Sequence, residues 1–102
     1  MSETAIPLRI SRTSDGLVVS GEVDASTAAT LSSFLTPLPG ESVDVAIDMS
    51  DVAFIDSSGL RALIEAHQRA EHAQRRLIIT NPSSIVSRLI DLSGLGDLFN
   101  VA

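Results

Sequence analysis

The chain has 102 residues, of which 44% are hydrophobic and 20% charged, a profile that predicts one compact globular domain spanning residues 1–102. Seven basic and thirteen acidic residues give a formal net charge of −6, which disfavours nucleic acid and anionic membrane surfaces as partners because both are negatively charged. The absence of cysteine excludes disulfides, thiolate zinc sites and thiol nucleophiles.

The first five residues do not resemble an export signal. Glu3 stands where a signal peptide carries basic residues, and no apolar run of the chain approaches the roughly 20 residues that cross a bilayer. We therefore expect a soluble, cytoplasmic protein with no membrane partner.

The first part of the chain predicts a hairpin followed by a helix. Residues 8–12 alternate apolar and polar side chains, residues 15–16 form an Asp-Gly turn, and residues 17–19 resume the apolar pattern. Short oxygen-bearing side chains at 24–27 can accept the free N–H groups of a helix start. Apolar residues then recur at helical spacing over 27–38, until prolines and a glycine end the helix.

The second part alternates strands and helices. Residues 43–48 alternate apolar and polar side chains and predict a strand with one apolar face, and a central helix begins close to Ser57. The continuous apolar run 77–79 is typical of a strand buried on both faces. A third helix carries apolar residues over 85–92 and has Gly94 as its stop signal.

These elements give the order ββαβαβα, followed by a short apolar tail at 95–101. Strands separated by helices need parallel crossovers. The predicted fold class is therefore α/β, with one mixed, mostly parallel sheet, an N-terminal hairpin and helices packed against the sheet.

The strongest candidate for chemistry is the segment 54–60, Phe-Ile-Asp-Ser-Ser-Gly-Leu, where a buried strand turns directly into a helix N-terminus. Such a terminus presents unpaired N–H groups and about half a positive charge, so a hydroxyl there lies in a field that stabilises an added phosphate. On the residues alone, the simpler interpretation is that Ser57 and Ser58 only cap the helix.

A serine hydrolase finds little support in the sequence. Its nucleophile elbow has the pattern Gly-x-Ser-x-Gly, but no glycine lies among residues 54–56 before Ser57. The two possible bases are His67, on the apolar stripe of the helix where a satisfied histidine is usual, and His72, which lies off that stripe. We therefore expect no catalytic residue and no enzymatic activity.

Metal and nucleotide sites are likewise not predicted. Two histidines five positions apart on a helix do not share a face, so they cannot form a helical zinc pair. Solvated strand and loop faces account for the aspartates at 44, 48, 51 and 56 without a magnesium ion, and the isolated glycines form no phosphate-cradling loop. We expect neither a metal nor a cofactor.

Three segments together resemble the STAS domain family, and specifically the stand-alone bacterial anti-sigma factor antagonists. They are residues 21–24 with Thr27, residues 54–60, and residues 92–99. The resemblance covers almost the whole chain with the segments in the right order. Two positions depart from the family's pattern: residues 73–76 stand where glycines are common, and Ser84 stands where a proline is common.

The resemblance implies a protein that binds an anti-sigma factor, itself an ATP-dependent serine kinase, and so releases a sigma factor. Phosphorylation of Ser57 would switch the protein off, and a serine phosphatase would reset it. Asp24 and Asp56 would be the acidic residues beside this serine, and Ser58 with Gly59 would complete the turn that the kinase contacts. The alternative within the same fold is an unregulated STAS accessory subunit of a transporter ATPase or of a signalling scaffold, in which Ser57 would only be a cap.

Overall fold

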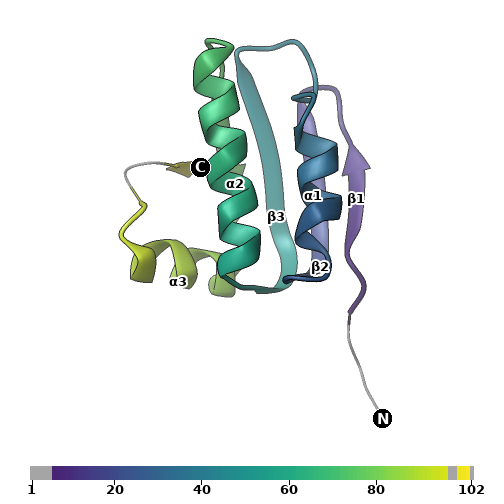
Figure 1. Cartoon of the computed structure of the whole chain (residues 1–102), viewed down its shortest axis with the longest axis vertical. Coiled ribbons are helices and arrows are strands. Elements are labelled where there is room, and N and C mark those ends of the chain that lie inside the picture. Colours follow the sequence, from purple (N-terminus) through teal and green to yellow (C-terminus); the bar gives the residue numbers. More distant parts are fainter. Residues whose placement is uncertain (1–5, 97–98, 102) are drawn as a thin grey trace.

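The computed structural model describes residues 6–96 and 99–101 and contains five strands and three helices within them (Figure 1). The elements in chain order are β1 (Arg9–Arg12), β2 (Gly16–Val23), α1 (Ala28–Leu35), β3 (Asp44–Ile55), α2 (Ser57–His72), β4 (Arg76–Thr80), α3 (Ser84–Ser93) and β5 (Asn100–Val101). The predicted order is confirmed, and the apolar tail adds the short strand β5. The N-terminal segment 1–5, and residues 97 and 98 of the third family segment, lie outside the described residues.

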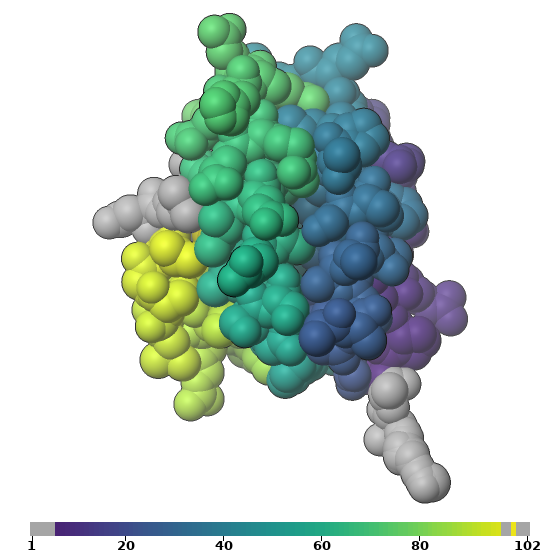
Figure 2. Space-filling view, viewed as in Figure 1, coloured from purple at the N-terminus to yellow at the C-terminus, as the bar shows by residue number. Residues whose placement is uncertain are grey.

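The strands form one sheet in the order β1-β2-β3-β4-β5. β1 pairs antiparallel with β2, and every other neighbouring pair is parallel, so the predicted mixed, mostly parallel sheet is confirmed. Figure 1 shows α1 and α2 lying across the same face of this sheet. Their side chains meet along a seam on the molecular surface (Figure 2).

The sheet buries one face of β3 and β4 beneath the helices. In β3, Val45 and Ile47 are fully buried, and they pair with Leu77 and Ile79 of β4, which are also buried. The intervening residue of β4, Ile78, is only half-buried. The prediction that 77–79 is buried on both faces is therefore wrong, because Ile78 keeps part of its surface exposed between two buried neighbours.

The connection after α2 departs from ordinary backbone geometry at Gln74. Gln74 has a φ of 60°, in the left-handed region that favours glycine. The backbone N–H of Arg75 donates to the carbonyl of Ala70 at 2.8 Å, which closes the turn. Gln74 thus lies in the segment 73–76, where the family commonly has glycines.

Candidate functional site

The candidate site lies where β2 and β3 end side by side. Val23 pairs with Ile55 in the parallel ladder, and the backbone N–H of Asp56 donates to the carbonyl of Val23 at 3.2 Å. Asp24 and Asp56 therefore begin two neighbouring loops at the same edge of the sheet. The strand register brings together two segments that are far apart in the sequence.

Asp56 caps α2. Its backbone is extended, and its Oδ1 accepts hydrogen bonds from the N–H of Ser58 at 2.9 Å and from the N–H of Gly59 at 3.3 Å. This carboxylate satisfies two of the free donors that every helix N-terminus leaves. The simpler interpretation, in which the two serines cap the helix, is therefore wrong.

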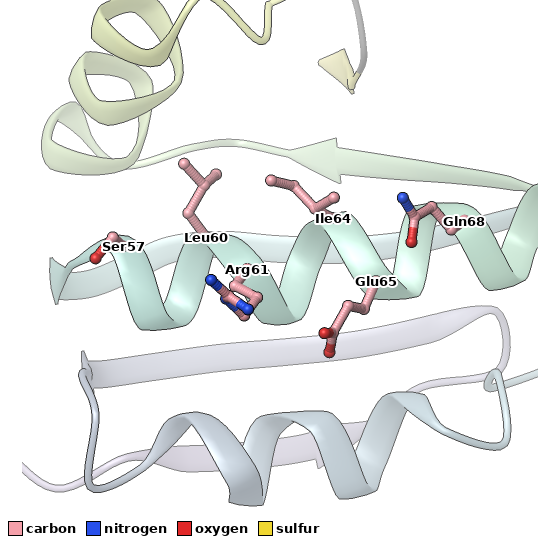
Figure 3. Close-up of a pocket in the computed structure, with 6 residues that line it drawn as sticks. All are labelled: Ser57, Leu60, Arg61, Ile64, Glu65 and Gln68. Carbon is pink, nitrogen blue, oxygen red and sulfur yellow. The ribbon is translucent and has the colours of Figure 1, made fainter.

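Ser57 is the first residue of α2, and its side chain is exposed. Within the part of the chain that the structure describes, its hydroxyl makes no hydrogen bond. It lies at one end of an open hollow of about 440 Å³ along α2 (Figure 3). The other lining residues are Leu60, Arg61, Ile64, Glu65 and Gln68.

Gly59 allows the first turn of α2 to pack closely against the ends of β2 and β3. It is buried, and a Cβ added to it would lie 2.7 Å from Cγ1 of Val23 and 2.8 Å from Cγ1 of Ile55. Both distances are far shorter than van der Waals contact between carbons. The missing side chain lets α2 begin directly on the ends of β2 and β3, which fixes the position of Ser57. The expectation that Gly59 and the half-buried Ser58 contact a partner kinase stays a prediction.

Asp24 organises the neighbouring loop. Its Oδ1 accepts hydrogen bonds from the hydroxyl of Ser26 at 2.7 Å, the N–H of Ser26 at 2.9 Å and the hydroxyl of Thr27 at 3.3 Å. These bonds, the one from the Ser26 hydroxyl foremost, lower the pKa of Asp24 despite an opposing contribution from desolvation. The site therefore carries a stable negative charge at Asp24.

Thr27 stands at the N-cap position of α1 but makes no side-chain capping bond. Its hydroxyl accepts from the N–H of Asp24 at 2.9 Å and lies 3.0 Å from the carbonyl of Glu22, to which it can donate. The expectation that the side chains of 24–27 accept the free N–H groups of α1 is thus wrong for this residue, because its hydroxyl is held by the loop.

The two histidines lie away from Ser57. His67 is buried, and among the described residues neither ring nitrogen has a hydrogen-bond partner, although Nε2 lies 3.5 Å from Oε2 of Glu71. Its ring packs edge-on against Phe99, with 5.9 Å between centroids. The expected hydrogen-bond partner of His67 is therefore not found among the described residues. His67 follows Ser57 by almost three helical turns, about 15 Å along the axis, so it cannot act as a base on this hydroxyl.

Two of the aspartates on β3, Asp44 and Asp48, have local partners. Asp44 pairs with Arg76 at 2.7 Å, and Asp48 accepts from the N–H and hydroxyl of Ser50 and from the amide of Asn81. Within residues 6–96 and 99–101, no group of three or more His, Asp or Glu side chains is arranged to hold a metal ion. No helix in the same ranges is long and apolar enough to span a membrane.

Comparison with known proteins agrees with the geometry. The family model described as the STAS domain matches residues 11–102. The anti-sigma-B factor antagonist of Bacillus subtilis is 30% identical over 84 residues, covering 82% of this chain and 77% of that protein. The protein of the same name from Staphylococcus epidermidis is 32% identical over 84 residues, covering 81% and 78%.

A solved structure gives the same result for the fold. The crystal structure of an anti-sigma factor antagonist from Mycobacterium paratuberculosis superposes with a TM-score of 0.72 at 25% sequence identity, covering 95% of this chain and 85% of that one. The resemblance predicted from the three sequence segments is confirmed. The chain belongs to the STAS domain family.

Proposed function

We propose that this chain is an anti-sigma factor antagonist whose binding surface is the segment around Ser57. It binds an anti-sigma factor that is also an ATP-dependent serine kinase, frees the sigma factor, and is inactivated when Ser57 is phosphorylated. The names of the relatives from Bacillus subtilis and Staphylococcus epidermidis support the binding role. The observation that carries the regulatory role is the free, exposed hydroxyl of Ser57 beside a helix cap supplied by Asp56.

In the phosphorylation step, this chain supplies the nucleophilic hydroxyl and its position. The Ser57 oxygen attacks the γ-phosphorus of ATP, the new O–P bond forms as the bond to the β-phosphate oxygen breaks, and ADP leaves. The hydroxyl proton passes to a base on the kinase, since neither histidine of this chain reaches Ser57. The chain contributes a fixed position for the hydroxyl, which the cap at Asp56 and the close packing of Gly59 provide.

The phosphate changes binding more than it changes folding. Phosphoserine adds about −1.5 to −2 charges, and the dipole of α2 offsets part of its repulsion from Asp56. A partner surface that fits a hydroxyl has no such compensation, so it must desolvate the dianion at a large cost. We therefore expect the phosphorylated protein to remain folded and to release its partner.

Affinity capture from host extract tests this function with Ser57→Ala and Ser57→Asp baits. We expect the alanine bait to recover an ATPase-like kinase and the aspartate bait to lose it. Ser84→Asp is a matched control, because Ser84 is also an exposed first residue of a helix, α3. Recovery of the kinase by both Ser57 baits would contradict the regulatory role.

Intact-mass measurement separates the proposal from the unregulated accessory subunit. The protein is isolated from its native host grown with and without starvation. A mass increase of one phosphate on the peptide that contains Ser57 supports the switch. Its persistent absence under both conditions favours the accessory subunit.

A further inference from the structure

Arg61 lies one helical turn after Ser57 on α2, and both side chains line the same hollow. Figure 3 shows Arg61 between Ser57 and Glu65 along the helix. Side chains at positions i and i+4 of a helix are surface neighbours. A group attached to the Ser57 oxygen would therefore extend into the space that the guanidinium of Arg61 can reach.

The guanidinium of Arg61 is not engaged elsewhere in the described structure. The arginine ion pair among the described residues is Arg76–Asp44, so Arg61 forms none there. Arg69, Arg75 and Arg76 donate hydrogen bonds to protein acceptors, whereas Arg61 donates to none of the described residues. Arg61 is exposed, so no bond has to be broken for it to turn toward position 57.

Three carboxylates belong to the region of this pair, those of Glu65, Asp56 and Asp24, the last in the loop beside Asp56. Glu65 follows Arg61 by one turn and lines the same hollow, while Asp56 precedes Ser57. A carboxylate carries one negative charge, whereas a phosphate carries up to two and matches the guanidinium fork with two parallel hydrogen bonds. An acidic group that precedes a basic group by four residues is also the more favourable order on a helix. The phosphate is therefore a stronger partner for Arg61 than Glu65.

We propose that Arg61 is the positioning residue that binds the phosphate of phosphorylated Ser57. The proposal rests on the proposed function in that Ser57 must be phosphorylated. Phosphorylation adds a dianion to the binding surface. Its pairing with Arg61 would also neutralise the cation beside it. It would also hold the phosphate at the end of the hollow that Ser57 and Arg61 both line.

The test uses the full chain with phosphoserine incorporated at position 57 during synthesis, so that no kinase is needed. Titration of the phosphate by ³¹P NMR is compared between this protein and its Arg61→Gln variant. We expect the titration midpoint to be about 0.3 pH units higher in the variant, since a cation favours the dianion. High salt should narrow this difference. Equal midpoints at low salt would overturn the proposal.

Two further variants control for other effects. Arg88→Gln removes an exposed arginine of α3 that does not line the hollow at Ser57, and it should leave the midpoint unchanged. Arg61→Lys keeps the charge without the planar fork, so its midpoint should lie between those of the parent and the glutamine variant. A shift in Arg88→Gln as large as that in Arg61→Gln would contradict a local pair.

Partner affinity distinguishes a failure of this proposal from a failure of the proposed function. If the phosphate weakens anti-sigma factor binding but the NMR midpoints are equal, the Arg61 pair is wrong and the switch stands. If the midpoints differ but the phosphate leaves anti-sigma factor binding unchanged, the pair stands and the switch is wrong.

Discussion

At the start of α2, Asp56 caps the helix and Ser57 presents an exposed hydroxyl. The carboxylate of Asp56 accepts hydrogen bonds from the N–H groups of Ser58 and Gly59, so the hydroxyl of Ser57 is not used for capping in the described structure. The sequence predicts that this segment is important, but it does not predict which residue caps the helix, because aspartate and serine are both good caps. The backbone makes Asp56 the cap, since position 56 is extended and position 57 is already helical.

The substitution Asp56→Asn should impair phosphorylation more than folding. An asparagine oxygen can still accept the two capping hydrogen bonds, so we expect a stability change well below the roughly 1 kcal/mol of a lost cap. The neutral amide accepts these hydrogen bonds more weakly than the carboxylate and holds the first turn of α2 less firmly, so we expect slower phosphate incorporation by the cognate kinase. Both quantities are measured on the same samples, with Asp24→Asn as a parallel variant because Asp24 holds its loop in a similar way. Unchanged kinetics in both variants would contradict the acidic pair.

Asp48 should contribute to the pH dependence of stability. Hydrogen bonds from the N–H of Ser50 foremost, then from its hydroxyl and from Asn81, lower the pKa of Asp48 from its ordinary value of 3.8. A carboxyl whose folded pKa is lowered stabilises the protein above its unfolded pKa, and this contribution is lost as the pH falls through the folded pKa. Asp48→Asn should therefore lower Tm by about 1–4 °C at pH 7, and the difference should vanish as the pH falls well below 3.8.

Thermal melts between pH 7 and pH 2.5 measure this effect. Asp51→Asn is the matched control, because Asp51 is exposed on the same strand and makes no side-chain hydrogen bond in the described structure. A Tm difference for Asp48→Asn that stays constant over the whole range would refute the assignment.

At the scale of elements, the sequence predicts what is periodic and misses what is short or depends on register. The 3.6-residue pattern and Gly94, with a φ of 74°, correctly place α3 and its end. β5 has two residues, too few to carry a period, and it forms because it can pair with β4. The proximity of Asp24 and Asp56 depends on the pairing of β2 with β3, which no local pattern contains.

The close packing of α2 on the strand ends predicts a cost for Gly59→Ala. The added Cβ would collide with Cγ1 of Val23 and Cγ1 of Ile55, and the better helix propensity of alanine offsets only part of that overpacking. We expect a loss of about 1–2 kcal/mol in the free energy of unfolding, measured by denaturant titration. Gly96→Ala is the control, since a Cβ there meets none of the described residues within 4 Å and should change stability by less than about 0.5 kcal/mol. A neutral Gly59→Ala would show that the packing adjusts freely.

The turn after α2 predicts a stabilising substitution. Gln74 has a φ of 60°, which costs a residue with a Cβ more than it costs glycine. Gln74→Gly should therefore raise the free energy of unfolding by about 0.5–1 kcal/mol. The higher conformational entropy of glycine in the unfolded chain reduces this gain. Gln74→Ala keeps the strained backbone and should give no gain. Equal stabilisation by both variants would mean that the side chain, not the backbone, causes the strain.

At the scale of the whole molecule, the candidate switch lies at the edge of the sheet and the core lies beneath α1 and α2. Residues such as Leu31, Ile47 and Leu63 are fully buried, whereas Ser57 is exposed at the first turn of α2. A phosphate on Ser57 would therefore meet solvent and the N-terminus of α2 rather than the buried core. It takes the net charge from −6 to about −8 without entering the core.

This separation predicts that phosphorylation of Ser57 abolishes partner binding without unfolding the protein. Around the phosphate, the dipole of α2 and the surrounding solvent offset much of the added charge, so we expect Tm to change by less than about 3 °C. At the interface the dianion is desolvated without compensation, and a loss of roughly 3 kcal/mol already lowers affinity more than a hundredfold. Calorimetric titration of both forms against the anti-sigma factor, alongside their melting curves, measures the two effects. Equal affinities would rule out the switch, and a collapsed Tm together with lost affinity would mean that phosphorylation acts by unfolding the chain.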